Sequence, residues 1–313
     1  MSEKKMTSIG GQAVIEGIMM RGPEKIAVAV RKPDGDIIID EIKGKSRGKI
    51  RKIPLVRGVF SFIDSMVIGI KALMFSANFY DDEGKPLENE EKKDDSSKEK
   101  SEEMSGWMMA ITVLFSVFFS VALFIAAPNL IAGIVVPNVE DGGNVVVYNI
   151  VESVVKIVIF LAYLLLVSRM KDIQRVFEYH GAEHKTIFCY ENGEELTVEN
   201  VKKYQRFHPR CGTSFLLFVI IISIIVFSIV GRFESGIINL LVRIALLPVI
   251  AGISFEIIRF AGKNTDKKCI AWLNKPGMWL QRLTTREPDE KQIEVAIAAL
   301  KEVLPKDKDA DNW

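Results

Sequence analysis

Four long apolar runs dominate the pattern of hydrophobic and polar positions along the chain. No charged side chain occurs between Met104 and Val139 or between Gly212 and Gly231, and Val145–Val167 and Gly236–Ile258 carry only a few. Each run is long enough to supply the roughly 20 apolar residues that cross a bilayer core. Helices buried inside a large soluble protein are an alternative, but soluble helices rarely stay apolar on every side. The pattern therefore predicts four transmembrane helices.

A further segment, Pro54–Tyr80, is helical in pattern but carries charges at regular intervals. Arg57, Asp64 and Lys71 recur every seven residues, which places them on one side of a helix. We expect an amphipathic helix that lies in the membrane interface or re-enters it. A fifth full span is disfavoured, because a charge at the centre of a bilayer costs about 2.5–3.5 kcal/mol or more.

Residues 1–53 have the pattern of a small β-rich unit. The string "AVAVRKPDGDIIIDEI" places apolar runs on either side of a Pro-Asp-Gly turn, which indicates a β-hairpin. The preceding string "IGGQAVIEGIMMRGP" is rich in glycine, which favours tight turns or a close approach of the backbone. The predicted fold class is a mainly α membrane protein with four transmembrane helices, one amphipathic interfacial or re-entrant helix and a small β-rich N-terminal cytoplasmic unit.

Charged stretches divide the rest of the chain. Residues 81–105 contain 11 acidic and 5 basic side chains and almost no apolar ones, so we expect a disordered linker. The C-terminal string "DEKQIEVAIAALKEVL" has apolar residues at helical spacing. The predicted organisation is a β-rich unit (1–53), an amphipathic helix (54–80), an acidic linker (81–105), a four-span membrane domain (106–261) with a cytoplasmic loop (168–213), and a cytoplasmic C-terminal segment (262–313).

The distribution of basic residues predicts the orientation in the membrane. The 168–213 loop holds eight lysines and arginines, whereas the connections on the opposite side hold only Arg232. The positive-inside rule therefore places both termini and this loop in the cytoplasm. The stretch Lys43–Arg57 carries seven bases and no acid, which favours contact with anionic lipid headgroups, although a solvated strand edge would look the same. The expected partner is the lipid bilayer; no nucleic acid is expected, and protein partners stay open.

Histidine is concentrated in one part of the chain. Of only three histidines, His180 and His184 lie in "EYHGAEHK" and His208 follows in "RFHPRCGTS". The surrounding pattern predicts a helix that ends at Asn192-Gly193. On that helix the two imidazoles lie one turn apart and can reach one Zn²⁺. Glu183 completes an H-x-x-E-H string and is the candidate general base.

The third ligand stays open between His208 and Cys211, which both precede the third span. Three protein ligands with an open position are typical of catalytic zinc, and four ligands of structural zinc. Zinc is the expected metal, with iron or manganese as alternatives. The same residues are also compatible with surface His–Glu pairs on a helix or with histidines at the membrane interface.

Several charges lie within or beside the predicted spans. Glu256 and Arg259 are one helical turn apart and are a predicted ion pair, which either anchors the helix or holds a ligand histidine. Glu152 and Lys156 are spaced to neutralise each other, and Arg243 is a predicted partner for them. Charges within spans are functional hypotheses by default, but helix packing is favoured here.

A resemblance becomes visible once these motifs are assembled. The strings "GGQAVIEGIMMRGP", "RGVFSF", "EYHGAEHKTI", "HPRCGTSF", "SFEIIRF" and "PGMWLQRLTTREPDEKQIEVAIAAL" together resemble the YqhQ-like family of bacterial membrane proteins. The resemblance implies a bacterial inner-membrane protein, described as a domain of unknown function and a predicted metal-dependent enzyme. It implies no substrate. The family's motif positions correspond to Gln12, Glu16, Arg21, His180, Glu183, His184, His208, Cys211, Glu256 and Arg259.

The sequence thus supports three functional hypotheses. The first is a polytopic metalloprotein with a cytoplasm-facing H-x-x-E-H site that acts as a metal-dependent hydrolase at the membrane surface, on a peptide or a lipid. Gln12, Glu16, Arg21, Glu256 and Arg259 would then support the site or face the substrate. The second is a non-enzymatic assembly or partner-binding protein with a structural metal. The third, a transporter, is disfavoured because two spans lack any charge.

Overall fold

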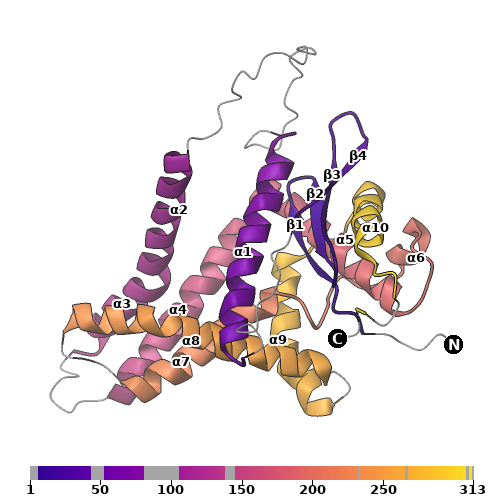
Figure 1. Cartoon of the computed structure of the whole chain (residues 1–313). Coiled ribbons are helices and arrows are strands. Elements are labelled where there is room, and N and C mark those ends of the chain that lie inside the picture. The colour runs from indigo at the N-terminus through magenta and orange to yellow at the C-terminus, as the bar shows by residue number, and fades with distance from the viewer. Residues whose placement is uncertain are drawn as a thin grey trace. The chain divides into compact units, whose positions relative to one another are not determined.

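We describe a computed structural model of the chain, which covers residues 6–43, 53–80, 106–137, 145–231, 233, 235–264, 267–307 and 310–311 (Figure 1). It confirms a mainly helical chain with a small N-terminal sheet. Helices and strands follow in this order: β1 (Gly10–Val14), β2 (Gly17–Arg21), β3 (Ile26–Arg31), β4 (Ile37–Glu41), α1 (Val56–Ala77), α2 (Gly106–Val121), a π-helical turn η2 (Ala122–Ala126), α3 (Ala127–Val135), α4 (Val145–Val167), α5 (Lys171–Glu191), α6 (Val198–Lys202), α7 (Thr213–Val230), α8 (Gly236–Lys263), α9 (Lys268–Thr284) and α10 (Glu290–Val303).

The chain divides into two compact units, and three of the four boundaries between them fall inside the long helices α4, α7 and α8. The first unit contains the sheet, α1, α5, α6, α9 and α10. The second contains α2, η2, α3 and most of α4. The first unit comprises residues Met1–Leu87, Leu164–Val219 and Ala251–Trp313. The second comprises Glu88–Tyr163 and Ile220–Ile250.

The sheet is an antiparallel meander with the order β1-β2-β3-β4. The predicted hairpin is present: β3 and β4 pair from Arg31↔Ile37 onward. Their turn is closed by the amide of Lys32, which donates to the carbonyl of Asp36 at 2.8 Å. Gly35 takes a φ of 96°, a left-handed conformation that glycine adopts without steric cost. The glycine-rich string before this hairpin forms the second hairpin, β1–β2.

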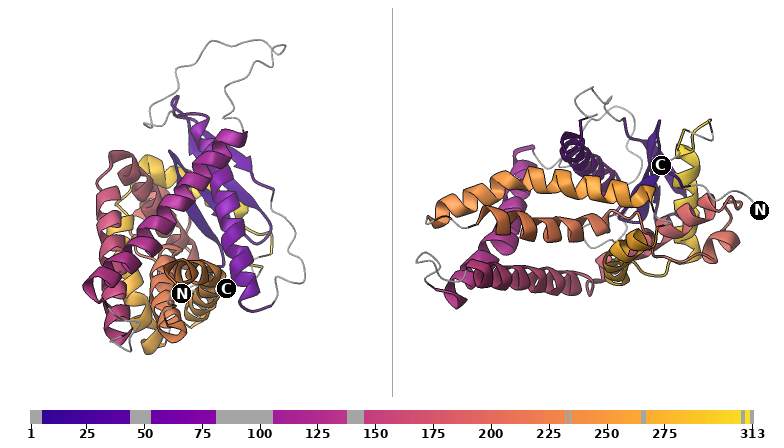
Figure 2. Two further views of the ribbon diagram at one scale, coloured as in Figure 1. Left: turned by 90° about the vertical axis from the view of Figure 1, so that its left-hand side faces the viewer. Right: turned by 90° about the horizontal axis from the view of Figure 1, so that it is seen from below.

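Helices cover both faces of the sheet (Figures 1 and 2). One face packs Ile18, Met20 and Ala29 against residues of α5 and α10. The opposite face packs Met19, Val28 and others against Ile68 and Ala72 of α1. The alternation of side chains along a strand sends successive residues to these two cores. The sheet therefore holds α5, which carries the histidine motif, at a fixed place.

The C-terminal helix closes the first core. Asp289 caps α10 by accepting from the Gln292 amide at 2.8 Å, while the Gln292 side chain accepts from the Asp289 amide at 2.9 Å. This capping box satisfies two amides that no helical carbonyl can reach. The predicted terminal helix is confirmed, and its apolar face joins the same core as α5.

Five helices are long and apolar enough to cross a membrane, by length and composition (Figure 1). They are the four predicted spans, with α2, η2 and α3 forming one continuous apolar segment, and α1. Large apolar side chains such as Phe118, Ile134 and Ile229 are exposed, as lipid-facing residues are. The chain is a membrane protein. Whether α1 crosses the bilayer or lies along it stays a prediction, as does the orientation of the termini.

The charges of α1 and α8 pair differently from the prediction. The carboxylate of Glu256 accepts from the Nε of Arg57 at 2.6 Å and from its Nη2, so its ion-pair partner is Arg57 and not Arg259. Sequence spacing identified Arg259 because it lies one turn away on the same helix. The bidentate contact with α1 is the stronger geometry for a guanidinium. Most of the basic stretch Lys43–Arg57 and the whole of the predicted linker 81–105 lie outside the described residues.

The second unit contains a buried charge cluster. Arg243 of α8 donates from Nη1 to the Glu152 carboxylate, and Lys156 Nζ lies 3.7 Å from the same carboxylate. All three side chains are buried, and both cations lie over the ring of Phe227. The predicted pairing of these residues is confirmed.

We expect Glu152→Gln to destabilise the protein strongly. The substitution leaves two buried cations without their carboxylate, and breaking a buried ion pair in this way costs about 3–5 kcal/mol. The measurement is thermal unfolding of the full chain in detergent. Ser153→Ala, on the next position of α4, is the matched control and should change stability little. Equal melting temperatures for the two variants would contradict the assigned role of Glu152.

Candidate metal centre

Helix α5 begins after the extended residue Met170 and ends at Asn192, as predicted. Gly193 follows with a φ of 69°, the left-handed conformation that commonly terminates helices. Tyr179 and Ala182 of α5 are fully buried against the sheet and α10. One face of the helix is thus committed to the core. His180 and His184 project from a neighbouring face.

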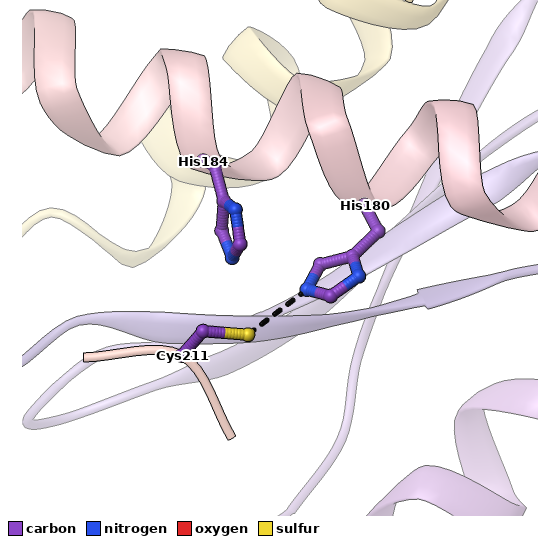
Figure 3. A group of neighbouring side chains, drawn as sticks. All are labelled: His180, His184 and Cys211. Carbon is purple, nitrogen blue, oxygen red and sulfur yellow. Dashed lines mark hydrogen bonds between the residues drawn. The ribbon is translucent and has the colours of Figure 1, made fainter. Parts of the chain in front are cut away.

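The two imidazoles lie next to each other, and Cys211 lies opposite them (Figure 3). The ring centroids of His180 and His184 are 4.4 Å apart. One nitrogen of each histidine and the sulfur of Cys211 lie within 4.8 Å of one another. His184 and Cys211 are buried, and His180 is partly accessible. Among the described residues, these three form the group with the spacing of metal ligands.

Backbone carbonyls fix the tautomer of both imidazoles. The Nδ1 of His180 lies 2.8 Å from the carbonyl oxygen of Thr284, and the Nδ1 of His184 lies 2.5 Å from that of Arg206. A carbonyl oxygen only accepts hydrogen bonds, so each Nδ1 carries the proton and donates. Each Nε2 therefore presents its lone pair. Metal-ligating histidines are oriented in this way, by donating their other ring N–H to a carbonyl or carboxylate.

The two lone pairs have different surroundings. The Nε2 of His180 lies 3.2 Å from the Cys211 sulfur (Figure 3). The Nε2 of His184 is buried and has no hydrogen-bond partner within the described part of the chain. A buried polar atom without a partner costs about 1–3 kcal/mol. Metal coordination is one way in which such a lone pair is satisfied.

Cys211 lies just before α7, and its sulfur contacts the first residue of that helix. The amide of Thr213 donates to its sulfur at 3.4 Å, and the Thr213 hydroxyl lies 3.2 Å away. These two contacts hold the Cys211 sulfur at the start of α7.

His208 lies close to the group, with its ring centroid 5.6 Å from that of His184, but its Nδ1 and its backbone contact other residues. The amide of Arg210 donates to its Nδ1 at 3.3 Å, so the proton of the neutral ring is on Nε2. That Nε2 lies 3.5 Å from a carboxylate oxygen of Glu191 and, like the Nε2 of His184, makes no hydrogen bond within the described residues. The backbone amide and carbonyl of His208 are both bonded to the Gln281 side chain, at 2.8 Å each. Of the two candidate third ligands, the structure therefore places Cys211, and not His208, with the other two.

Glu183 is fully buried at the border of the group. One carboxylate oxygen accepts from the amide of Gly11 in β1 at 2.8 Å, and the other has no partner among the described residues. Burial raises the pKa of this carboxyl, while the nearby His180 and the Gly11 amide oppose the shift. A carboxyl with a raised pKa and one free oxygen suits proton transfer near neutral pH.

The remaining predicted site residues are not brought into this group. The Glu16 carboxylate is held by Arg175 and accepts from the Tyr179 hydroxyl at 3.0 Å, which fixes the β1–β2 turn on α5. The Gln12 side chain lies against Gly69 of α1. Glu256 is bonded to Arg57, far along the chain from the histidines. Arg21 lies at the end of β2, opposite Gly10 of β1, and Arg259 lies in α8.

Sequence reasoning missed the groups that orient the ligands. Gln281, Thr284 and Arg206 lie within the quoted strings, but nothing in those strings assigned them contacts with the histidines. Every residue has a backbone carbonyl, so only the fold shows which carbonyls meet an imidazole. Gly181 gave a partial signal: a Cβ there would collide with the carbonyl of Arg286, so the close approach of that segment to α5 requires glycine.

Comparison with known proteins identifies relatives. A family model described as "Protein of unknown function (DUF1385)" matches residues 53–306. The chain is also 38% identical over 312 residues to "Uncharacterized protein YqhQ" of Bacillus subtilis (strain 168), across 97% of this chain and 95% of that relative. No solved structure matches the chain. These descriptions assign no activity, so function has to be argued from the site.

His208 should make stability depend on pH. Burial lowers its pKa to about 4 from 6.5, so the folded chain keeps it neutral. Keeping the ring neutral contributes to the free energy of unfolding. This contribution is fully present above pH 6.5 and is lost as the pH falls toward 4, because the unfolded chain then binds a proton that the folded chain does not. The shift corresponds to about 3 kcal/mol.

The test compares the free energy of unfolding of the wild type with that of His208→Gln between pH 7.5 and 4.5. We expect the wild type to lose more stability than the variant over this range. The same loss in both proteins would contradict a neutral, buried His208.

Proposed function

The chain belongs to the DUF1385 family of proteins of unknown function, and we propose that it is a membrane metalloprotein with a hydrolytic His₂Cys centre. His180, His184 and Cys211 would hold the metal, and Glu183 would move the proton. The single observation that carries this proposal is the pair of Nε2 lone pairs, each oriented by a backbone carbonyl and aimed toward one cysteine sulfur.

The chemistry of the three ligand atoms favours zinc. Two imidazole nitrogens and one thiolate are the donors that Zn²⁺ takes, at about 2.0–2.1 Å and 2.3 Å respectively. Ca²⁺ and Mg²⁺ prefer oxygen ligands, and the group contains none. Iron and manganese, which accept carboxylate ligands more readily, fit less well.

Three protein ligands leave one coordination position open. A metal held by these residues would supply an activated water as the nucleophile near neutral pH. Glu183 follows His180 by three positions and precedes His184 directly, so its carboxylate lies beside the group. Its oxygen without a partner is suited to accept the proton, while the Gly11 amide fixes the other oxygen. The hydrolytic role is inferred from this arrangement.

A closed structural site would need a fourth ligand, and His208 is the candidate that the sequence offers. Its Nε2 carries a proton and lies near Glu191, so it is poorly oriented for the metal. This orientation is why we favour an open site over a structural one.

A second candidate function follows from the 3.2 Å contact between His180 Nε2 and Cys211 Sγ. A histidine in this position can activate a cysteine as a covalent nucleophile. A cysteine enzyme, however, would leave the buried Nε2 of His184 without a role.

Metal content distinguishes these functions. We expect the full chain, purified in detergent without chelator, to contain stoichiometric zinc by elemental mass spectrometry. His184→Ala and Cys211→Ser should lose the zinc, because each removes one of three ligands. His208→Gln is the matched control and should keep it. Loss of zinc in all three variants would indicate a closed site, and absence of zinc from the wild type would overturn the metal centre in favour of the cysteine nucleophile.

The catalytic role has its own test. Glu183→Gln retains the oxygen that accepts from Gly11 but cannot take up a proton. We expect it to keep zinc and to lose about 10²–10⁴-fold of any hydrolytic turnover, the usual contribution of a general base. A variant that retains full turnover would show that Glu183 is not the base.

A further inference from the structure

The outer edge of strand β1 lies beside the candidate metal centre. β1 pairs with β2 on one side only, and it is the first strand in the sheet order. In the β1–β2 hairpin, Val14 opposes Gly17 across a two-residue turn. The backbone N–H and C=O groups of alternate β1 residues, counted from Val14, therefore point toward β2. Gln12 and Val14 use their backbone groups toward β2, and Gly11 and Ala13 face outward. The amide of Gly11 donates to Glu183, which is consistent with this alternation.

Ala13 presents a free backbone pair at this edge. Within the described residues, its outward N–H and C=O form no hydrogen bond. The neighbouring Gln12 is exposed, and a Cβ on Gly10 would meet open space. In an antiparallel sheet, two directly opposed residues each donate their N–H to the other's C=O. The outward N–H and C=O of Ala13 could form such a pair with one residue of an added strand.

Helix geometry places this edge next to the histidines. Each residue of an α-helix turns about 100° from the previous one. Tyr179 and Ala182 of α5 therefore face the core under the sheet, His180 and His184 face away from it, and Glu183 points between the two directions. Because Glu183 reaches the outer edge of β1, a chain lying along that edge would run past His180, which is partly accessible.

Glu183 covers the Gly11 amide, but the strand itself carries no charged residue and no proline. Proteins usually protect an edge strand with charged residues or proline. The opposite edge strand β4 ends in Asp40-Glu41, whereas β1 consists of "GGQAV" and has neither. The part of this edge at Ala13, beside the proposed hydrolytic centre, is suited to binding another extended backbone.

We infer that the substrate is a polypeptide, which binds in extended conformation as an added antiparallel strand on β1, with its main chain paired to the N–H and C=O of Ala13 and to the C=O of Gly11, whose N–H is held by Glu183. This inference rests on the proposed hydrolytic function and names its substrate class. A lipid ester lacks the regularly spaced N–H donors that would pair with the outward carbonyls of β1, so a peptide fits the edge better. The polypeptide can come from a soluble protein or from a membrane protein.

The test uses the zinc-loaded full chain in lipid nanodiscs and two libraries of tryptic peptides, one from a bacterial membrane fraction and one from the soluble fraction. Binding is measured with immobilised Glu183→Gln protein, as the peptides retained, identified by mass spectrometry. Cleavage is measured with the wild type. Ala13→Pro removes the outward N–H without touching the β1–β2 hydrogen bonds, and proline is tolerated at such edge positions. Ala13→Ser is the matched control.

We expect Ala13→Pro to reduce peptide retention and cleavage roughly tenfold or more, since it deletes one hydrogen bond and adds a clash, while Ala13→Ser binds as before. Zinc content should be unchanged in both. Equal retention by the two variants, or no retained peptide, would overturn this inference. Peptides that are retained but not cleaved by the wild type would instead overturn the hydrolytic function. The library that supplies the retained peptides identifies their source.

A second measurement does not depend on the folding of a variant. A retained peptide is synthesised in two forms. One carries N-methyl groups on the amides of its odd-numbered residues, and the other on those of its even-numbered residues. Strand pairing predicts that the form methylated on the amides facing β1 does not bind, because those amides can no longer donate. The other form should bind as the unmodified peptide does. Equal binding of the two methylated peptides would contradict pairing with β1.

Discussion

Two hydrogen bonds from imidazole Nδ1 atoms to backbone carbonyls determine what this site can do. The carbonyls of Thr284 and Arg206 hold the rings of His180 and His184 in the tautomer whose Nε2 lone pair faces Cys211. Both carbonyls depend on the rest of the first unit. Arg206 precedes the segment held by Gln281, and Thr284 ends α9 close to where the Arg286 amide donates to the Phe177 carbonyl of α5. The sheet and α10 bury the other face of the same helix.

Much of this arrangement can be predicted from local patterns. Hydrophobic periodicity identifies α5 and α10, the Pro-Asp-Gly turn identifies the β3–β4 hairpin, and apolar length identifies the four predicted spans. The i, i+4 spacing of His180 and His184 places them on one face because helix geometry is fixed. The pairing of Glu152 with Arg243 also follows, since a buried carboxylate needs a cation and few are present in the spans.

The rest depends on contacts between distant segments. Sequence left His208 and Cys211 as equal candidates, and the choice between them depends on an amide of Arg210 and a carboxylate of Glu191. Arg259 was the wrong partner for Glu256 because spacing along one helix gives no information about α1, which brings Arg57. The contact of Gly11 with Glu183 joins residues 172 positions apart. No local pattern encodes such a contact.

The central claim is that one zinc ion is bound by two imidazoles and one thiolate with a light atom in the fourth position. X-ray absorption spectroscopy at the zinc edge, on the full chain in detergent, tests it most directly. The account predicts one sulfur at about 2.3 Å and three nitrogen or oxygen neighbours at about 2.0–2.1 Å, with multiple scattering from two imidazole rings. A shell without sulfur, or with three imidazole rings and one sulfur, would contradict the account.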